Sequence, residues 1–445
     1  METIRQENNS VAFDIVVIGG GPAGLAAAIE AKKQGISKVL VIERDTEPGG
    51  ILQQCIHNGF GIHFFNEELT GPEYAQRFIN TAREENVEIL LDTMVTSISR
   101  DRKIKAMNSG GILDIEAKAI ILAMGCRERT RGAIAIPGDR PSGIFTAGTA
   151  QRYINIEGYM VGKKAIVLGA GDIGMIMARR IVLEGGEVIA VLARGSHAKG
   201  LTRNIVQCLD HYDIPLLYNH NIIKISGKER VESVTIAATD ENKKVIPGTE
   251  KEYECDTVLL SVGLIPENEL SRIAGTEIDR RTGGPLVNES METSVPGIFA
   301  CGNVVHVHDV VDFVTEESIR AGENAASFVK ANFEKTNYVN NSYAKNKNNI
   351  EAGYMNTVVS GGISYCVPQR LRYTEMPDKL DLFLRVDDLY DEARIVIKNQ
   401  GKELAGFRKR NLCPGEMIKL PLQKSIFENA EGDIEVALES GGRGK

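Results

Sequence analysis

Two stretches of the chain share one pattern of apolar and polar positions. Residues 13–45 start with the apolar run IVVIG, pass through a glycine turn into a helix-like segment, and end in a second apolar run, KVLVIE. Residues 164–194 repeat this order, from AIVLG to VIAVLAR. Short apolar runs bounded by glycine predict buried strands, and a helical segment between two of them predicts a βαβ unit. We therefore expect two such units.

Other segments show their own periods. Residues 70–86 predict a helix, because Pro72 stands just inside its start. The runs AKAIILAMG at 117–125 and TVLLSVG at 257–263 predict short buried strands. Another strand is expected within residues 284–304, followed by a helix in EESIRAGENAASFVKANF. These elements extend the two βαβ units into full α/β domains.

The last hundred residues follow a different pattern. NYVNNSYAKNKNNIEAG, at 337–353, is rich in asparagine and has no apolar period, which predicts a linker. Beyond it, LDLFLRVD, ARIVIKNQGKEL and GDIEVALES alternate at period two, which is typical of strands. A small all-β domain is expected here.

The predicted fold class is α/β, with two nested Rossmann-like dinucleotide-binding domains and a small C-terminal all-β domain. The first domain is expected to be discontinuous, over residues 1–150 and 265–345. The second occupies residues 151–264, and the β domain residues 350–445. A length of 445 residues is compatible with about three domains.

Composition narrows the classes of function. A net charge of −8 argues against nucleic acid as a partner, since that would require a basic face. The N-terminal METIRQENNSVAF has no apolar core, so no signal peptide is expected, and no uncharged apolar run predicts a membrane-spanning helix. The seven cysteines are scattered and form no CxxC, which is typical of a reducing compartment. We expect a cytoplasmic protein.

The first glycine turn has the context of a dinucleotide fingerprint. Gly19, Gly21 and Gly24 follow a strand and open a helix, and Glu43 ends the next strand, where a carboxylate can accept ribose hydroxyls. The helix N-terminus offers unpaired N–H groups to a pyrophosphate. A glycine loop without a ligand is the competing interpretation.

The second turn, Gly169, Gly171 and Gly174, has the same context. Its far strand ends in Arg194, where an NAD site usually has an acid. Because an arginine can accommodate a 2′-phosphate, NADPH is favoured over NADH. If Arg194 only points to solvent, this preference disappears, so the expected cofactor is NAD(P)H.

Several motifs in order carry a resemblance to a known superfamily. The turn GGILQQ, the loop HNGFG, the helix start TGPEY and, far downstream, AIILAMGCRER and TSVPGIFACGNV resemble the pyridine nucleotide–disulfide oxidoreductases, within them the thioredoxin reductase-like flavoproteins. The resemblance covers roughly residues 12–330. It implies an oxidoreductase with FAD in the first unit and NAD(P)H in the second.

The resemblance also implies two sets of binding residues. For FAD these are Gly19, Gly21, Pro22, Ala23, Gly24, Glu43, Arg44, Gly49, Gly50, Leu52, Gln53, Asn58, Met124, Gly125, Gly302 and Asn303. For NAD(P) they are Gly169, Gly171, Asp172, Ile173, Gly174, Arg194 and Gly263.

The chain departs from the family pattern at informative places. Met124 stands where the family has threonine, and Asn303 where it has the aspartate that binds the ribityl chain. A neutral amide forms weaker hydrogen bonds than a carboxylate, so flavin binding is expected to weaken but survive, unless Asn303 merely ends a strand. Neither of the family's cysteine pairs is present. No dithiol relay is therefore expected.

Two polar clusters remain. Cys55 and His57 are the candidate catalytic pair, since a thiolate beside an imidazolium is reactive, although a buried thiol beside a structural histidine is the alternative favoured here. His306, His308, Asp309 and Asp312 follow the second flavin motif and are expected in a polar flavin shell or on a partner surface. No metal is expected, because no separate third ligand is evident.

Finer motifs resemble a subgroup without the redox disulfide. QCIHNGFG, PGDRPSGIFTAGTAQR, CGNVVHVHDVVDFVTEES and the C-terminal VVSGGISYCVPQR and LCPGEM are similar to those of the FAD oxidoreductase that accompanies glycerol-3-phosphate dehydrogenase. The subgroup also includes alpha-type subunits of sarcosine oxidase, opine oxidase and hydrogen cyanide synthase. It implies electron transfer between NAD(P)H and a partner dehydrogenase subunit of the glycerol-3-phosphate or amine type. The alternatives are a stand-alone NAD(P)H oxidase acting on oxygen or a quinone, and a scaffold subunit.

Overall fold

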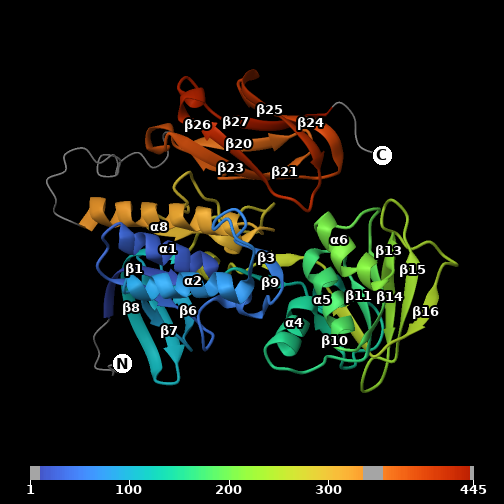
Figure 1. Cartoon of the computed structure of the whole chain (residues 1–445). Coiled ribbons are helices and arrows are strands. Elements are labelled where there is room, and N and C mark those ends of the chain that lie inside the picture. Colours follow the sequence, from blue (N-terminus) through green and yellow to red (C-terminus); the bar gives the residue numbers. More distant parts are fainter. Residues whose placement is uncertain (1–10, 334–353, 441–445) are drawn as a thin grey trace. The chain divides into compact units, whose positions relative to one another are not determined.

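The computed structural model describes residues 11–333 and 354–440. The chain forms two compact units, the first from residues 1–126 and 266–445 and the second from Arg127–Ile265 (Figure 1). The chain therefore passes from the first unit to the second at 126/127 instead of the expected 150/151. Residues before 150 belong to the second unit because β10 (Ile144–Thr146) pairs with its strand β17 (Thr257–Leu260). The predicted linker at 337–353 lies outside the described residues.

A mostly parallel sheet forms the centre of the first unit. Its parallel strands β5 (Glu88–Leu90), β2 (Val39–Ile42), β1 (Val11–Ile18) and β8 (Gly111–Leu122) lie in that order, with β19 (Ile298–Ala300) also beside β8. The antiparallel strands β7 (Lys103–Asn108) and β6 (Met94–Ile98) extend it. The run at 117–125 is thus the end of a longer strand than expected, since β8 also pairs with β7.

Three helices of the first unit stand at or near the predicted places. Helix α1 (Pro22–Lys33) packs against α8 (Val311–Phe333), where a Cβ on Gly322 would lie 2.3 Å from the carbonyl oxygen of Ala27. Helix α2 (Gly71–Glu84) starts at a capping box formed by Thr70 and Glu73. The remaining short elements are η1 (Gly50–Gln54), β3 (Asn58–Phe60), β4 (Leu69–Thr70), α7 (Glu269–Ile273) and η3 (Gly302–Val304).

The second unit repeats the parallel arrangement. Its five strands lie in the order β10, β17, β11 (Lys164–Leu168), β12 (Glu187–Ala193) and β13 (Leu216–Tyr218). The helices of this unit are α3 (Arg131–Ile134), α4 (Ala147–Asn155), α5 (Asp172–Leu183) and α6 (Thr202–Cys208). An antiparallel sheet of β14 (His220–Ser226), β15 (Ser233–Ala238) and β16 (Lys251–Glu254) completes it, and the short strands β9 (Cys126–Glu128) and β18 (Leu264–Pro266) pair with each other.

The described C-terminal segment is all strands and 3-10 turns, as predicted. One sheet contains β22 (Arg370–Leu371), β20 (Met355–Ser360), β27 (Ile434–Ser440), β24 (Tyr390–Asn399) and β25 (Lys402–Leu412), and the other β21 (Ile363–Val367), β23 (Lys379–Val386) and β26 (Ile418–Gln423). Alternate side chains of the two sheets form a core of their own. Buried ion pairs connect this segment to the first unit's main sheet region, among them Arg372–Glu289 at 2.9 Å and Arg385–Asp309 at 2.7 Å.

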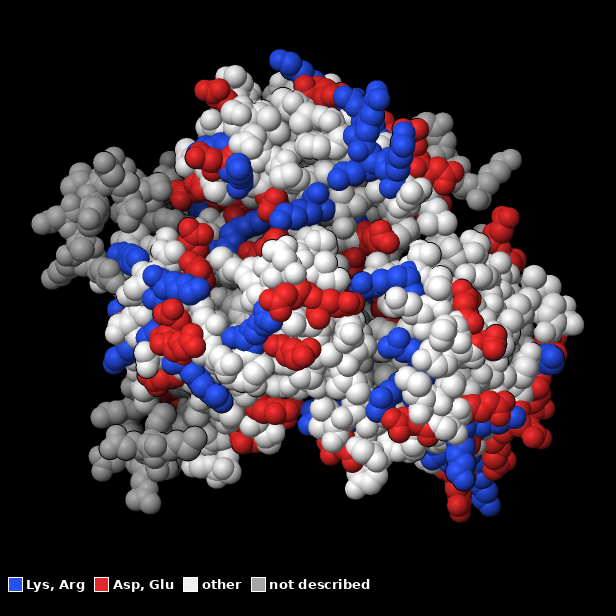
Figure 2. All heavy atoms as spheres, in the orientation of Figure 1, with Lys and Arg blue, Asp and Glu red and all other residues white. Residues whose placement is uncertain are grey.

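Figure 2 shows the charged side chains on one face of the molecule. On the face shown in Figure 2, acidic and basic side chains are interspersed rather than gathered by sign. Among the described residues, no helix combines the length and the apolar character needed to cross a bilayer.

Candidate functional site

In the first glycine turn, packing requires glycine at two positions but not at the third. A Cβ on Gly19, whose φ is +107°, would lie 2.4 Å from the carbonyl oxygen of Ala123, and one on Gly24 would lie 1.8 Å from that of Gly19. Among the described residues, a Cβ on Gly21 would meet nothing closer than the Cα of Gly50, at 3.8 Å. Protein packing therefore does not require glycine at position 21. The open side of this residue, at the N-terminus of α1, fits the approach of a pyrophosphate.

Glu43 is buried at the end of β2 with its carboxylate fixed. Its Oε2 accepts a hydrogen bond from the backbone N–H of Gly20 at 2.6 Å, and its Oε1 accepts one from the backbone N–H of Asp45 at 2.8 Å. Each carboxylate oxygen has a second acceptor site, so both can still receive a hydroxyl proton. The group is thus oriented beside the glycine turn, as a ribose site requires.

The structure brings distant flavin-motif residues to this turn. A Cβ on Gly302 would lie 2.9 Å from the Cβ of Ala23, and one on Gly50 would lie 2.9 Å from the Cα of Gly21. Asn303 directs its amide oxygen to the backbone N–H of His308, at 2.9 Å. Segments near residues 20, 50, 124 and 302 therefore meet at the same edge of the sheet, the carboxyl ends of its parallel strands.

Other predicted FAD residues have protein partners. Arg44 forms an ion pair with Glu267 at 3.0 Å, and the Gln53 amide donates to the carbonyl oxygen of Pro48 at 2.8 Å. Leu52 is buried in a cluster with α2. The remaining predicted positions are Pro22 at the start of α1, Gly49 at the cap of η1, Asn58 in β3, and the half-buried Met124 and Gly125 after β8.

The second turn repeats this geometry. A Cβ on Gly169 would lie 1.9 Å from the carbonyl oxygen of Ser261, and one on Gly174 would lie 2.5 Å from that of Gly169. A Cβ on Gly171 would have only the Ser261 hydroxyl nearby, at 3.5 Å. The second turn thus offers a second open cradle at the N-terminus of α5, and both cradles fit a dinucleotide.

The other predicted residues of the second turn contact residues that were not expected from the sequence. Asp172 accepts hydrogen bonds from the Leu201 N–H at 2.8 Å and the Asn204 amide at 2.6 Å, so it fastens the following loop to α5. Ile173 is half-buried and packs against the hydrophobic core of the second unit. Gly263 holds its φ at +106° and accepts from the N–H of Arg129 at 3.0 Å.

Several cations lie near this second turn. Arg194 follows β12 and is exposed. The pKa of Lys199 is lowered, by partial desolvation and by the positive charges of Lys243, Arg194 and Arg129. A bound phosphate would relieve the repulsion among these four positively charged side chains. Only Arg194 among them was expected from the sequence.

Comparison with known proteins decides the family. The model of the pyridine nucleotide-disulphide oxidoreductase family matches residues 13–327. The chain belongs to this family. Members of the pyridine nucleotide-disulphide oxidoreductase family are FAD-containing, NAD(P)H-dependent oxidoreductases, so the predicted family and cofactor pair are confirmed.

Individual relatives within the family are distant. The chain is 28% identical over 322 residues to one of the subunits of opine oxidase from Agrobacterium tumefaciens, covering 65% of this chain and 61% of that protein. It is 28% identical over 318 residues to an NADH oxidase of Methanocaldococcus jannaschii, covering 68% and 64%. The chain thus spans less than two thirds of these relatives. The crystal structure of T. acidophilum thioredoxin reductase, 24% identical, matches 71% of this chain and 98% of its own with a TM-score of 0.59, which confirms the fold.

The cysteines of this chain do not form the disulfide after which the family is named. All seven cysteines lie in the described residues, and none of them forms a disulfide. Cys55 donates to the carbonyl oxygen of Ile51 at 3.2 Å, and burial raises the pKa of its thiol to about 12. The ring of His57 lies against Phe60 with centroids 5.1 Å apart. These contacts favour the structural interpretation of Cys55 over the nucleophilic one.

We expect Cys55 to be inert toward alkylation. Because its pKa is about 12, the thiolate required for attack is scarce at pH 8, and iodoacetamide is expected to modify it at least tenfold more slowly than an unfolded control. Cys55→Ser is expected to keep wild-type turnover. Mass spectrometry of timed alkylation checks the first expectation, and rapid labelling at pH 7 would show that the thiol is activated.

The second polar cluster is buried and includes a residue that the sequence missed. His306 and His308 lie below one tenth exposure, and they meet Glu317 of α8, which is fully buried. Burial and the neighbouring His308 lower the pKa of His306 to about 4. Asp309 is paired with Arg385, and Asp312 accepts from the N–H of His63 at 2.8 Å. A partner surface formed by these histidines is therefore excluded.

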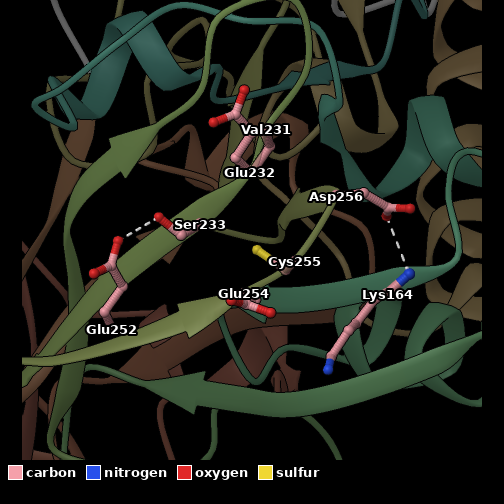
Figure 3. A pocket seen from close by; sticks show the side chains of 8 residues that line it. All are labelled: Lys164, Val231, Glu232, Ser233, Glu252, Glu254, Cys255 and Asp256. Carbon is pink, nitrogen blue, oxygen red and sulfur yellow. Dashed lines mark hydrogen bonds between the residues drawn. The ribbon is translucent and has the colours of Figure 1, made fainter.

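A separate hollow in the second unit contains none of the predicted residues. Figure 3 shows its lining, and Asp256 there accepts from the backbone N–H of Lys164 at 3.0 Å while Ser233 donates to Glu252 at 2.5 Å. Its other lining residues are Val231, Glu232, Glu254 and Cys255. The Asp256 and Glu252 carboxylates have hydrogen-bond partners within the unit, and the hollow is separate from the second dinucleotide cradle at Gly169–Gly174.

Proposed function

We propose that the protein is an FAD-dependent NAD(P)H oxidoreductase that passes electrons between a nicotinamide cofactor and a partner dehydrogenase subunit, without a redox disulfide. Two glycine cradles whose middle glycines, Gly21 and Gly171, have room for a Cβ carry this proposal, together with seven cysteines that form no disulfide. When bound, the nicotinamide and the flavin supply hydride transfer. The chain's own residues bind the pyrophosphates through the N-termini of α1 and α5 and orient a ribose through Glu43.

An anaerobic titration tests the redox chemistry. With flavin as the only redox group, one equivalent of NAD(P)H per bound FAD is expected to complete the bleaching. Reduction with dithiothreitol, alkylation with N-ethylmaleimide and gel filtration beforehand are expected to leave this endpoint unchanged. A flavin and a disulfide together would require two equivalents. An endpoint at two equivalents, lost after thiol blocking, would contradict the proposal, and a flavin that does not bleach would favour a scaffold subunit.

The partner is proposed from one relative, which is named as part of an opine oxidase. The sequence resemblance favours a dehydrogenase of the glycerol-3-phosphate or amine type. Reduced flavin in the isolated chain is then expected to react slowly with oxygen and rapidly with an artificial acceptor. Rapid turnover of NAD(P)H with oxygen alone would favour the second candidate, a stand-alone oxidase, which the similarity to an NADH oxidase supports. We propose a cytoplasmic location, because free cysteines are typical of a reducing compartment.

Arg194→Ala is expected to separate the two nicotinamide cofactors. If Arg194 binds the 2′-phosphate, the variant loses a charge-assisted interaction of about 1.5–3 kcal/mol, so the KM for NADPH rises about tenfold or more while that for NADH is unchanged. Arg203→Ala, an exposed arginine of α6 in the same unit, is the matched control and is expected to change neither. Equal KM shifts for both cofactors would contradict a 2′-phosphate contact.

A further inference from the structure

Three side chains with metal-binding atoms converge beneath the second flavin motif. His306 and His308 follow η3, and Glu317 lies in the second turn of α8. The Nε2 atoms of the two histidines lie 2.8 Å and 3.6 Å from Glu317 Oε2, and the three candidate ligand atoms lie within 4.8 Å of one another. Their side chains are at most 1% exposed. This is a closed cluster that the electron-transfer function proposed above does not use.

The hydrogen bonds around His308 leave a lone pair directed into this cluster. The oxygen of Asn303 accepts from the His308 backbone N–H at 2.9 Å, and the Nδ1 of the same histidine lies 3.3 Å from that oxygen. Since the oxygen can only accept, Nδ1 carries a proton, and in the neutral imidazole Nε2 then carries a lone pair. Among the described residues, this Nε2 has no hydrogen-bond partner.

A carboxylate oxygen lies close to that lone pair. Glu317 Oε2 lies 3.6 Å from His308 Nε2, and within the described residues its ion-pair partners are the two imidazoles alone. Glu317 Oε2 accepts a hydrogen bond from His306 Nε2 at 2.8 Å, so the atom left without a donor in this dry interior is His308 Nε2. A cation in place of the His306 proton would bind Glu317 Oε2 and both imidazole Nε2 atoms at once.

We propose that His306, His308 and Glu317 hold one transition metal ion of the zinc class. Two imidazoles and a carboxylate are a common donor set for zinc. Ligands about 2.0–2.1 Å from a tetrahedral ion lie about 3.3 Å apart, and the separations of 2.8 and 3.6 Å from Glu317 Oε2 bracket that value. The site was not expected from the sequence, because Glu317 lies in the following helix and meets the histidines only in the fold.

The surroundings of the cluster act as its outer support. Asn303 fixes the tautomer of His308, and the backbone N–H of Gly302 donates to Glu317 Oε1 at 2.7 Å, which leaves Oε2 for the ion. Both supporting residues belong to the predicted flavin motif. The ion would therefore tie this motif to α8 and act as a structural metal, since the buried cluster offers no exposed position for a substrate.

Metal analysis of the full-length, FAD-loaded protein tests the proposal. After zinc loading, gel filtration and dialysis against metal-free buffer, elemental analysis is expected to find about one zinc per chain. His308→Gln and His306→Gln are expected to retain at least tenfold less. His63→Gln is the matched control, because this exposed histidine lies in the same unit outside the cluster, and it is expected to retain the full amount. No retained zinc in the wild type, or full retention in both cluster variants, would overturn the proposal.

X-ray absorption of the zinc-loaded wild type decides the question even if the variants do not fold. The expected first shell contains only nitrogen and oxygen near 2.0–2.2 Å, with the outer-shell signature of imidazole. A sulfur ligand near 2.3 Å would place the ion on a cysteine and overturn the assignment. Because the readout is the metal itself, it is independent of the NAD(P)H titration that tests the proposed function.

Discussion

Gly21→Ala is expected to give a folded protein that has lost its flavin. The backbone of Gly21 has φ −74° and ψ −173°, which alanine adopts without strain, and its Cβ would meet no protein atom closer than 3.8 Å. The methyl group would instead occupy the space of the pyrophosphate. Loss of two hydrogen bonds to charged groups, at about 1.5–3 kcal/mol each, raises the Kd for FAD about 100-fold or more. Flavin absorbance per chain after reconstitution and gel filtration measures this.

Two companion variants separate binding from folding. Gly171→Ala makes the same change at the second cradle, and it is expected to keep the flavin but to prevent its reduction by NAD(P)H. Gly24→Ala places a methyl group 1.8 Å from the carbonyl oxygen of Gly19 and is expected to destabilise the fold by about 1–3 kcal/mol or more. If Gly21→Ala retained full flavin, the open side of the turn would not be the pyrophosphate site.

Arg372→Met is expected to lower the free energy of unfolding by about 3–5 kcal/mol, because it leaves a buried carboxylate without its partner. Arg372 contacts Glu289 through its side chain at 2.9 Å and through its backbone N–H at 2.8 Å, and Glu289 is fully buried. Arg370→Met is the matched control. Its partner Glu277 is more than half exposed, so a loss below about 1 kcal/mol is expected. Urea unfolding of both variants measures the difference.

The pH dependence of the Arg372→Met effect has a defined sign. Burial raises the pKa of Glu289 above its ordinary value, even though Arg372 opposes the shift, and removing Arg372 raises it further. The folded variant then binds a proton more tightly than the unfolded chain, so its stability falls as pH rises through the folded pKa. The destabilisation is expected to be smaller at pH 5 than at pH 8. Glu289→Gln in the Arg372→Met background is expected to restore stability at pH 8, and no restoration would contradict an unpaired carboxylate as the cause.

Local pattern was sufficient for the two dinucleotide cradles. Glycine spacing, a preceding apolar run and a following helix are all short-range features, and they located Gly19–Gly24 and Gly169–Gly174 correctly within strand–turn–helix units. The helix at Gly71 was equally clear, since its proline and capping box are local. The family resemblance then supplied what spacing alone does not give, the distinction between FAD and NAD(P).

Features that depend on distant contacts were not predictable. The boundary near residue 126 depends on the pairing of β10 with β17, more than a hundred residues apart. Glu317 gives no sign of a metal-type role until α8 folds back beneath His306 and His308. Lys199 and Lys243 join Arg194 only through the fold of the second unit. A single sequence gives no signal for such contacts between distant residues, because each of these residue types is also common on ordinary protein surfaces.

The bond between Arg372 and Glu289 has an evolutionary consequence. Loss of the C-terminal strands with Glu289 kept would leave that carboxylate without its cation, at a cost in stability like that expected for Arg372→Met. Versions of this architecture that end near the last helix are therefore expected to carry a neutral or apolar residue where this chain has Glu289. Glu289, well before the C-terminal strands in the sequence, would in that way indicate whether those strands are present.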